Sequence, residues 1–340
     1  MGVFPAHYPK EILWAFNTVP AEIWDPPFEI SAANAHLQPY ICSVVKTGLE
    51  LVLQGKGEFL DGFLFPHTCD SIQNMASIVY DYLGLDKACY FFYHPKAPYG
   101  PSSRHYYMDQ LKALISRLEK DFGTLEPTEL KRCVEQGRHL AAVLRDIYEM
   151  RRRGHLAATN ADFYRVIRQG EYLHPDQFIP LLEHFQKRYH GGASKGPGVV
   201  LSGVLPNPEE ILVLLDELGV RVVDDDFLCC SRRIPIETQA VQDPFEALAN
   251  AYFAMPPCTT KDSPLSERVN HLLNKTAAAS ASGVIFYMVK FCEPEWFDVP
   301  QMAEAVKGAG TSALTLDVDL NQGLSGQLTT RIEAFVEMMG

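Results

Sequence analysis

Short apolar runs alternate with helical patterns through the C-terminal part of the sequence. Four strand-like runs lie at 198–204, 220–224, 283–289 and 313–318. The helical stretches between and after them lie at 208–218, 243–254, 264–281, near 299–308 and from about 325. Parallel strands need a long crossover connection, and helices usually supply it. We therefore expect a doubly wound α/β domain over residues 191–340.

The N-terminal part shows the same alternation less regularly. Strand candidates at 59–65 and 88–93 each follow a helical stretch, and a short one lies at 21–25. Residues 104–190 are mostly helical in pattern, and the Gly-rich stretch from His190 to Gly198 is typical of a linker. The predicted fold class is α/β, with two doubly wound parallel-sheet (flavodoxin-like) domains and a helical segment between them. We expect the domains at 1–190, including the helical extension at about 104–190, and at 191–340.

Composition excludes several classes of partner. The 340 residues carry a net charge of −12, which repels nucleic acid phosphates and anionic lipid headgroups. No apolar run approaches the length of a membrane-spanning helix, and no segment has the pattern of a secretory signal. We therefore expect a cytoplasmic protein with no nucleic acid and no membrane as partner.

Eight cysteines are too few for a disulfide scaffold in a chain of this size, so we interpret them as reduced thiols. Cys69 and Cys292 each follow a predicted strand, one in each half, and Cys42 directly precedes the helical stretch 43–54. Ligands of open α/β sheets bind beyond the carboxyl ends of the strands, and a helix N-terminus favours a thiolate. Three thiolates with an open fourth position suit an iron-sulfur cluster. Alternatively they are small packing residues, and the chain is a metal-free small-molecule binding module.

The other five cysteines divide into two groups. Cys89 begins an apolar strand and Cys133 lies within an amphipathic helix, so both are predicted to be packing residues. Cys229 and Cys230 follow an acidic turn at another strand end, and Cys258 lies in a loop. These last three are candidates for positions near the same crevice.

Four segments of the chain resemble one enzyme family. They are HLQPYICS (36–43), LDGFLFPHTCD (60–70), GVIFYMVKFCEPEWFDVPQM (283–302) and GQLTTRIEAFVEM (326–338). In these segments, and in the turn at 222–232, the sequence resembles the 2-hydroxyacyl-CoA dehydratase and benzoyl-CoA reductase family. The similarity runs over nearly the whole chain in the family's order.

The resemblance implies an enzyme subunit with a [4Fe-4S] cluster between its two domains, held by Cys42, Cys69 and Cys292. It implies an acyl-CoA substrate, which is either dehydrated as a 2-hydroxyacyl-CoA (a lyase reaction) or reduced as an aromatic acyl-CoA (an oxidoreductase reaction). The implied partners are a homologous second subunit and an ATP-dependent activator that delivers a low-potential electron under anaerobic conditions. The alternatives are an electron-relay or scaffold subunit that binds no substrate, and a double-cubane cluster that also uses Cys229, Cys230 and Cys258.

Three polar residues are further candidates for the site. His67, beside Cys69, is the predicted catalytic residue, as a donor of a hydrogen bond to cluster sulfur or of a proton to substrate; alternatively it is a turn histidine. Lys195 and Arg232 are candidate contacts for the phosphates of CoA, or else solvated surface charges.

Overall fold

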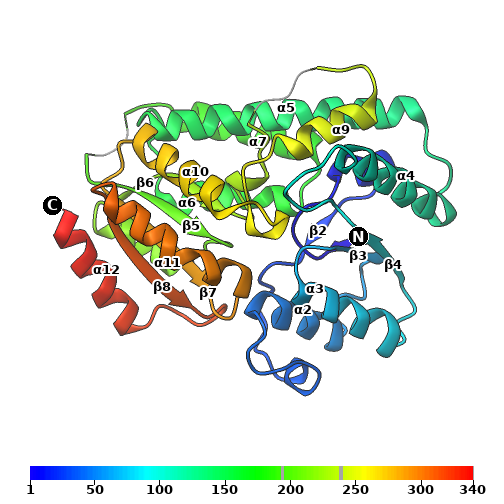
Figure 1. Ribbon diagram of the computed structural model, residues 1–340, viewed down its shortest axis with the longest axis horizontal. Coiled ribbons are helices and arrows are strands. Elements are labelled where there is room, and N and C mark those ends of the chain that lie inside the picture. The colour runs from blue at the N-terminus through cyan, green and yellow to red at the C-terminus, as the bar shows by residue number, and fades with distance from the viewer. Residues whose placement is uncertain (193–194, 237–239, 340) are drawn as a thin grey trace.

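The computed structural model describes residues 1–192, 195–236 and 240–339. Two four-stranded parallel sheets organise it (Figure 1). The first sheet contains β1 (Gly2–Val3), β2 (Ala21–Glu22), β3 (Gly62–Pro66) and β4 (Ala88–Phe92), in the order β2-β1-β3-β4. The second contains β5 (Gly198–Gly203), β6 (Arg221–Phe227), β7 (Gly283–Val289) and β8 (Ser312–Val318), in the order β6-β5-β7-β8. In both sheets the strands lie in the order second, first, third, fourth along the chain, and all of them are parallel. The predicted fold class, α/β with two parallel sheets, is confirmed.

Helices cover both sheets. Those of the N-terminal half are α1 (Lys10–Ala15), α2 (Ser43–Leu53) and α3 (Asp70–Ser77). The predicted helical segment consists of α4 (Ser103–Phe122), α5 (Pro127–Arg152), α6 (Asn160–Ile167) and α7 (Pro175–Arg188). The C-terminal half contributes α8 (Glu210–Glu217), α9 (Pro244–Phe253), α10 (Leu265–Ala278), α11 (Glu293–Gly308) and α12 (Gly326–Met339).

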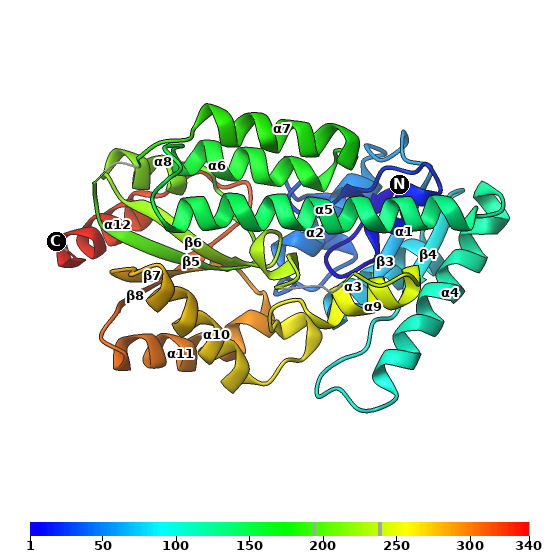
Figure 2. The same ribbon diagram turned by 90° about the horizontal axis from the view of Figure 1, so that it is seen from above.

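Helix α5 connects the two halves. It contacts α1 of the first half, and it also contacts α9 and strand β6 of the second. In Figure 2 it runs along both sheets. The division at residue 190 remains a prediction, and residues 193–194 of the predicted linker lie outside the described residues.

Strand β6 corrects one expectation. Asp224, Asp225 and Asp226 do not form a turn after the strand but lie within it, and each is at most 2% exposed. A buried carboxylate needs hydrogen bonds or a counter-charge. Four of their partners come from distant parts of the chain, namely Arg152, Lys275, Tyr148 and Tyr164. The fifth, Arg232, lies six residues after Asp226.

One helix boundary and one short strand also differ from the sequence-based expectation. Helix α11 begins at Glu293, six residues before the predicted 299, although Pro300 lies inside it. Strand β1 has only two residues, too few for a recognisable pattern, and was not predicted. Over the described ranges, none of the helices combines the length and the apolar character needed to cross a bilayer.

Candidate functional site

The three predicted cluster cysteines occupy the same structural position in three helices. Cys42, Cys69 and Cys292 are the N-cap residues of α2, α3 and α11. At this position the unpaired backbone N–H groups and the helix dipole favour a negative charge on the sulfur. Cys69 and Cys292 are also equivalent in the two sheets, because each follows the third strand of its sheet in chain order.

The structure brings these three thiols together. A hydrogen bond with Cys292 lowers the pKa of Cys42, and the same contact raises the pKa of Cys292 well above its usual value. Burial raises the pKa of Cys69 to about 11, and Cys42 and Cys69 interact electrostatically with each other and with Cys292. Segments from both halves of the chain therefore come close to one another at these thiols.

Backbone donors and lysines surround the sulfurs. The N–H groups of Val44 and Val45 lower the pKa of Cys42, and the charge of Lys46 acts in the same direction. Lys96 lies near Cys69 and donates to the carbonyl oxygens of Thr68 (2.9 Å) and Thr260 (2.5 Å). These groups stabilise the thiolate forms of Cys42 and Cys69, which metal ligation requires, against the burial that raises the pKa of Cys69.

The donor set fits a cluster better than a single metal ion. Within the part of the chain that the structure describes, no three His, Cys, Asp or Glu side chains are grouped as ligands of one ion. An iron-sulfur cluster binds its thiolates on separate irons, so its cysteines need not converge on one atom. Three thiols at helix N-termini with cations nearby are therefore compatible with such a cluster.

The second group of cysteines is divided between two places, of which the one with Cys258 shares Lys96 as a neighbour with Cys69. The sulfurs of Cys229 and Cys230 are 3.3 Å apart and buried. Cys258 is fully buried, 4.0 Å from Arg232 Nη1. Cys133 is fully buried and Cys89 packs against the main apolar core, as predicted for packing residues.

His67 lies in the same turn as Cys69, and its ring packs edge-on against Tyr93 with 5.5 Å between the ring centroids. Burial lowers the pKa of His67 below its usual 6.5, so the imidazole is neutral at pH 7. Its catalytic role remains a prediction.

The expectation for Arg232 was wrong. Its side chain is fully buried and forms ion pairs with Asp226 at 2.9 Å and with Glu295. Arg268 binds the same glutamate at 3.0 Å and Asp298 at 2.6 Å. Arg232 is thus neither a surface charge nor a phosphate contact; it holds the first turn of α11, which begins after Cys292. Lys195 is exposed.

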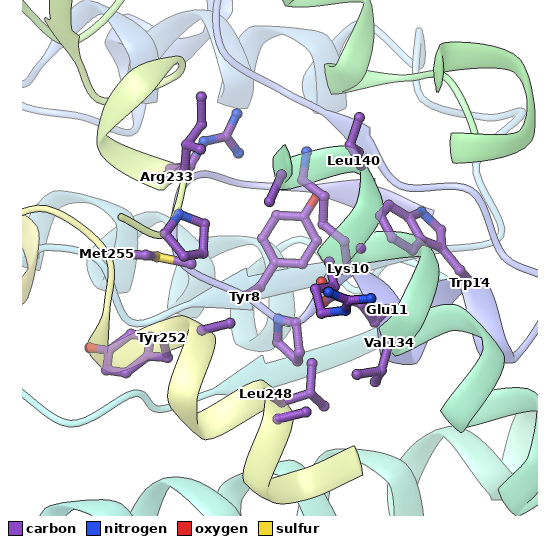
Figure 3. A pocket seen from close by; sticks show the side chains of 18 of the residues that line it. Tyr8, Lys10, Glu11, Trp14, Val134, Leu140, Arg233, Leu248, Tyr252 and Met255 are labelled. Atoms are coloured by element: carbon purple, nitrogen blue, oxygen red, sulfur yellow. The ribbon is translucent and has the colours of Figure 1, made fainter. Parts of the chain in front are cut away.

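A cavity of about 370 Å³ lies between α1, α5, α9 and the turn that follows β6 (Figure 3). Its walls are largely apolar and aromatic and include Trp14, Tyr107, Leu140, Leu248 and Tyr252. Cys229 and Cys230 contribute to it, whereas Cys42, Cys69 and Cys292 are not among the described residues that line it. Sequence patterns did not indicate this cavity.

Known proteins match this chain over nearly its whole length. The family model of the 2-hydroxyglutaryl-CoA dehydratase D-component matches residues 5–339. The (R)-phenyllactyl-CoA dehydratase beta subunit of Clostridium sporogenes is 26% identical over 348 residues, covering 100% of this chain and 91% of the relative. The lactoyl-CoA dehydratase beta subunit of Anaerotignum propionicum is 24% identical over 345 residues, with the same coverage of 100% and 91%.

A relative from the reductase branch also matches. One of the subunits of the benzoyl-CoA reductase of Thauera aromatica is 26% identical over 320 residues, covering 89% of this chain and 81% of the relative. These relatives agree with the prediction of an enzyme subunit of the lyase or oxidoreductase kind. The predicted resemblance is confirmed, and the chain belongs to the 2-hydroxyglutaryl-CoA dehydratase D-component family.

Proposed function

We propose that this chain is the cluster-binding subunit of an acyl-CoA enzyme, in which Cys42, Cys69 and Cys292 hold a [4Fe-4S] cluster. The reaction is either the dehydration of a 2-hydroxyacyl-CoA or the reduction of an aromatic acyl-CoA. The observation that carries the proposal is the meeting of three helix N-cap thiols, from both halves of the chain, at the carboxyl ends of the strands.

The chain's own residues provide what such a site requires. When bound, the cluster supplies one-electron chemistry at low potential. The N–H groups of Val44 and Val45 stabilise the Cys42 thiolate, and Lys46 and Lys96 offset the negative charge of the sulfurs. Cys42 is only 7% exposed, so bulk water has little access to its sulfur.

The relatives support the assignment as a subunit. Those described above are named as beta subunits of dehydratases or as one subunit of a reductase. We therefore include a homologous second subunit among the proposed partners. The family resemblance, and not the names of these relatives, adds an ATP-dependent activator as electron donor. The alternative is a subunit that relays electrons through its cluster but binds no acyl-CoA.

The first experiment measures iron in protein purified without oxygen. We expect about four irons per chain and a broad visible absorbance. Cys292→Ala should lose most of both, because it removes one of three ligands. Cys133→Ala is the matched control, since that buried thiol lies within α5, and it should retain them. Iron-free wild-type protein would contradict the proposal.

A second experiment separates the enzyme subunit from the relay. Acyl-CoA is titrated into the reduced protein, and the paramagnetic resonance spectrum of the cluster is recorded. A substrate-binding cluster changes its spectrum on titration. An unchanged spectrum favours the relay.

A further inference from the structure

The cavity between α1, α5 and α9 adjoins the cysteine site although it does not include the three cysteines. Ala6 lines the cavity, and its N–H donates at 2.9 Å to Oγ1 of Thr68, the residue before Cys69. His7 also lines it, and its Nε2 lies 2.9 Å from Thr260 Oγ1, whose backbone oxygen accepts from Lys96. One segment of chain, residues 6–7, thus separates the cavity from the Cys69 turn.

The buried cations at the cavity already have a carboxylate. Glu22 accepts from Lys10 at 2.6 Å and from Arg233 at 2.7 Å, and also from the Tyr8 hydroxyl at 2.8 Å. Tyr8, Lys10 and Arg233 all line the cavity and are labelled in Figure 3. Glu11, which lines the cavity and interacts with Lys10, is a second carboxylate, so a further carboxylate entering here would meet no uncompensated positive charge and would lose its hydration.

The remaining charges do not change this balance. Lys131 and Arg138 lie at the exposed rim, where they bind Gln242 and Glu135. Glu171 lines the cavity and pairs with Arg168 at 2.8 Å. A negatively charged ligand group is thus disfavoured inside.

Hydrogen-bonding capacity is nevertheless left over. Among the described residues lining the cavity, His7 Nδ1, Trp14 Nε1 and Arg233 Nε are buried and have no partner. Trp14 Nε1 and Arg233 Nε are donors, and His7 Nδ1 donates or accepts according to the ring tautomer. Unsatisfied buried polar groups cost free energy that a hydroxyl or carbonyl oxygen of a ligand recovers. The ligand therefore combines an apolar body with an uncharged oxygen.

We propose that this cavity receives the acyl part of the CoA thioester and selects an apolar, aromatic or branched aliphatic acyl group over a dicarboxylic one. The inference rests on the proposed function and deepens it. A volume of about 370 Å³ is at the lower end of the range of ligand pockets and suits an aryl or short alkyl group. The aromatic side chains of Trp14, Tyr107 and Tyr252 in the walls supply contacts for such a group.

The test compares three probes by titration calorimetry on the anaerobically purified full chain: phenylpropionyl-CoA, glutaryl-CoA and CoA itself. We expect phenylpropionyl-CoA to bind roughly tenfold or more tightly than glutaryl-CoA, as burial of an aromatic ring implies. Equal or tighter binding of glutaryl-CoA would overturn the inference, as would binding of the aryl ester no tighter than that of CoA.

Substitutions in the cavity wall test whether the acyl group binds in this cavity. Ala141→Leu on α5 fills part of the cavity and should weaken phenylpropionyl-CoA binding roughly tenfold while leaving CoA binding unaffected. Ala142→Leu, its neighbour outside the cavity lining, is the matched control and should bind as wild type does. Ala247→Leu narrows the cavity from α9 and should repeat the effect of the first variant.

The failure of this inference is distinguishable from failure of the proposed function. Protein that contains iron but binds both esters equally in all variants would refute the acyl cavity alone. Protein without iron would instead refute the cluster, whatever the calorimetry shows.

Discussion

The buried ion pairs of Arg232 give the sharpest prediction for stability. Replacing Arg232 with Met removes the guanidinium from a site where it is 0% exposed and its partners Asp226 and Glu295 are at most 3% exposed. Glu295 keeps Arg268 at 3.0 Å, whereas Asp226 keeps the Ser202 hydroxyl at 3.0 Å and the more distant charges of Arg268 and His271. One buried carboxylate thus loses its direct ion pair, which costs about 3–5 kcal/mol.

The cost depends on pH in a defined direction. With Arg232 present, the pKa of Asp226 is held at about 2, below its unfolded value of about 3.9. Its stabilising contribution is therefore fully present above about pH 4 and is lost as the pH falls toward 2. In Arg232→Met, burial without the cation raises the pKa of Asp226. Asp226 is then protonated at a higher pH than in the wild type, and protonation removes the cost of its buried charge. The difference between variant and wild type should be largest near pH 7 and shrink toward about pH 5.

Urea unfolding followed by circular dichroism measures this difference. Arg138→Met is the control, because its pair with Glu135 is exposed and should contribute less than about 1 kcal/mol. Adding Asp226→Asn to the Arg232→Met chain removes the uncompensated charge and should restore about 2 kcal/mol. A loss below about 1 kcal/mol near pH 7, or a loss independent of pH, would refute the reasoning.

Two further predictions concern the strand ends. Gly203 has φ +153°, and a Cβ added there would lie 2.1 Å from the Tyr287 backbone oxygen. Gly203→Ala should therefore destabilise the protein by about 2–3 kcal/mol in thermal unfolding. Gly308→Ala is the control and should not, because a Cβ there has no neighbour within 4 Å in the described structure. Burial lowers the pKa of His94 to about 3, so stability should fall from about pH 6 to pH 4 as the unfolded chain takes up a proton. His94→Asn should reduce that slope by about one proton, and an unchanged slope in pH-dependent urea unfolding would contradict the assignment.

The positions of Cys69 and Cys292 follow from local sequence because each closes a strong strand pattern. Apolar runs of five and seven residues are buried at every position in β3 and β7, and the turn after each contains the cysteine. Parallel topology places both turns at carboxyl edges without any knowledge of long-range contacts. Cys42 is predictable for a different reason, since it directly precedes a helix.

Arg232 and the acidic run of β6 were not predictable in the same way. A charged residue is normally exposed, and only a partner distant in sequence reverses that expectation. Glu295 follows Arg232 by 63 residues, and Tyr148 precedes Asp225 by 77. No periodicity within one segment contains that information, so the local pattern alone indicates a turn.

The cavity could not be predicted from the sequence because its walls come from several helices and loops. Residues 6–14, helix α5 and helix α9 form its walls, and each of these segments also has an ordinary core-facing surface. Apolar positions on α5 are the same whether they face a packed neighbour or a hollow. The difference lies in how closely α9 approaches α1 and α5, which is a property of the tertiary structure.

The same reasoning extends to the cysteine site, which depends on how the two halves are joined. Several bonds cross between them close to the strand ends: Ser43 to Asp319 at 2.8 Å, Asn207 to Asp25 at 2.6 Å, and Arg233 to Glu22 at 2.7 Å. Ser43 directly follows Cys42, so its bond ties the start of α2 to the end of β8 in the other sheet. Since Cys42 and Cys69 come from one half and Cys292 from the other, these contacts set the spacing of the three sulfurs as directly as either sheet does.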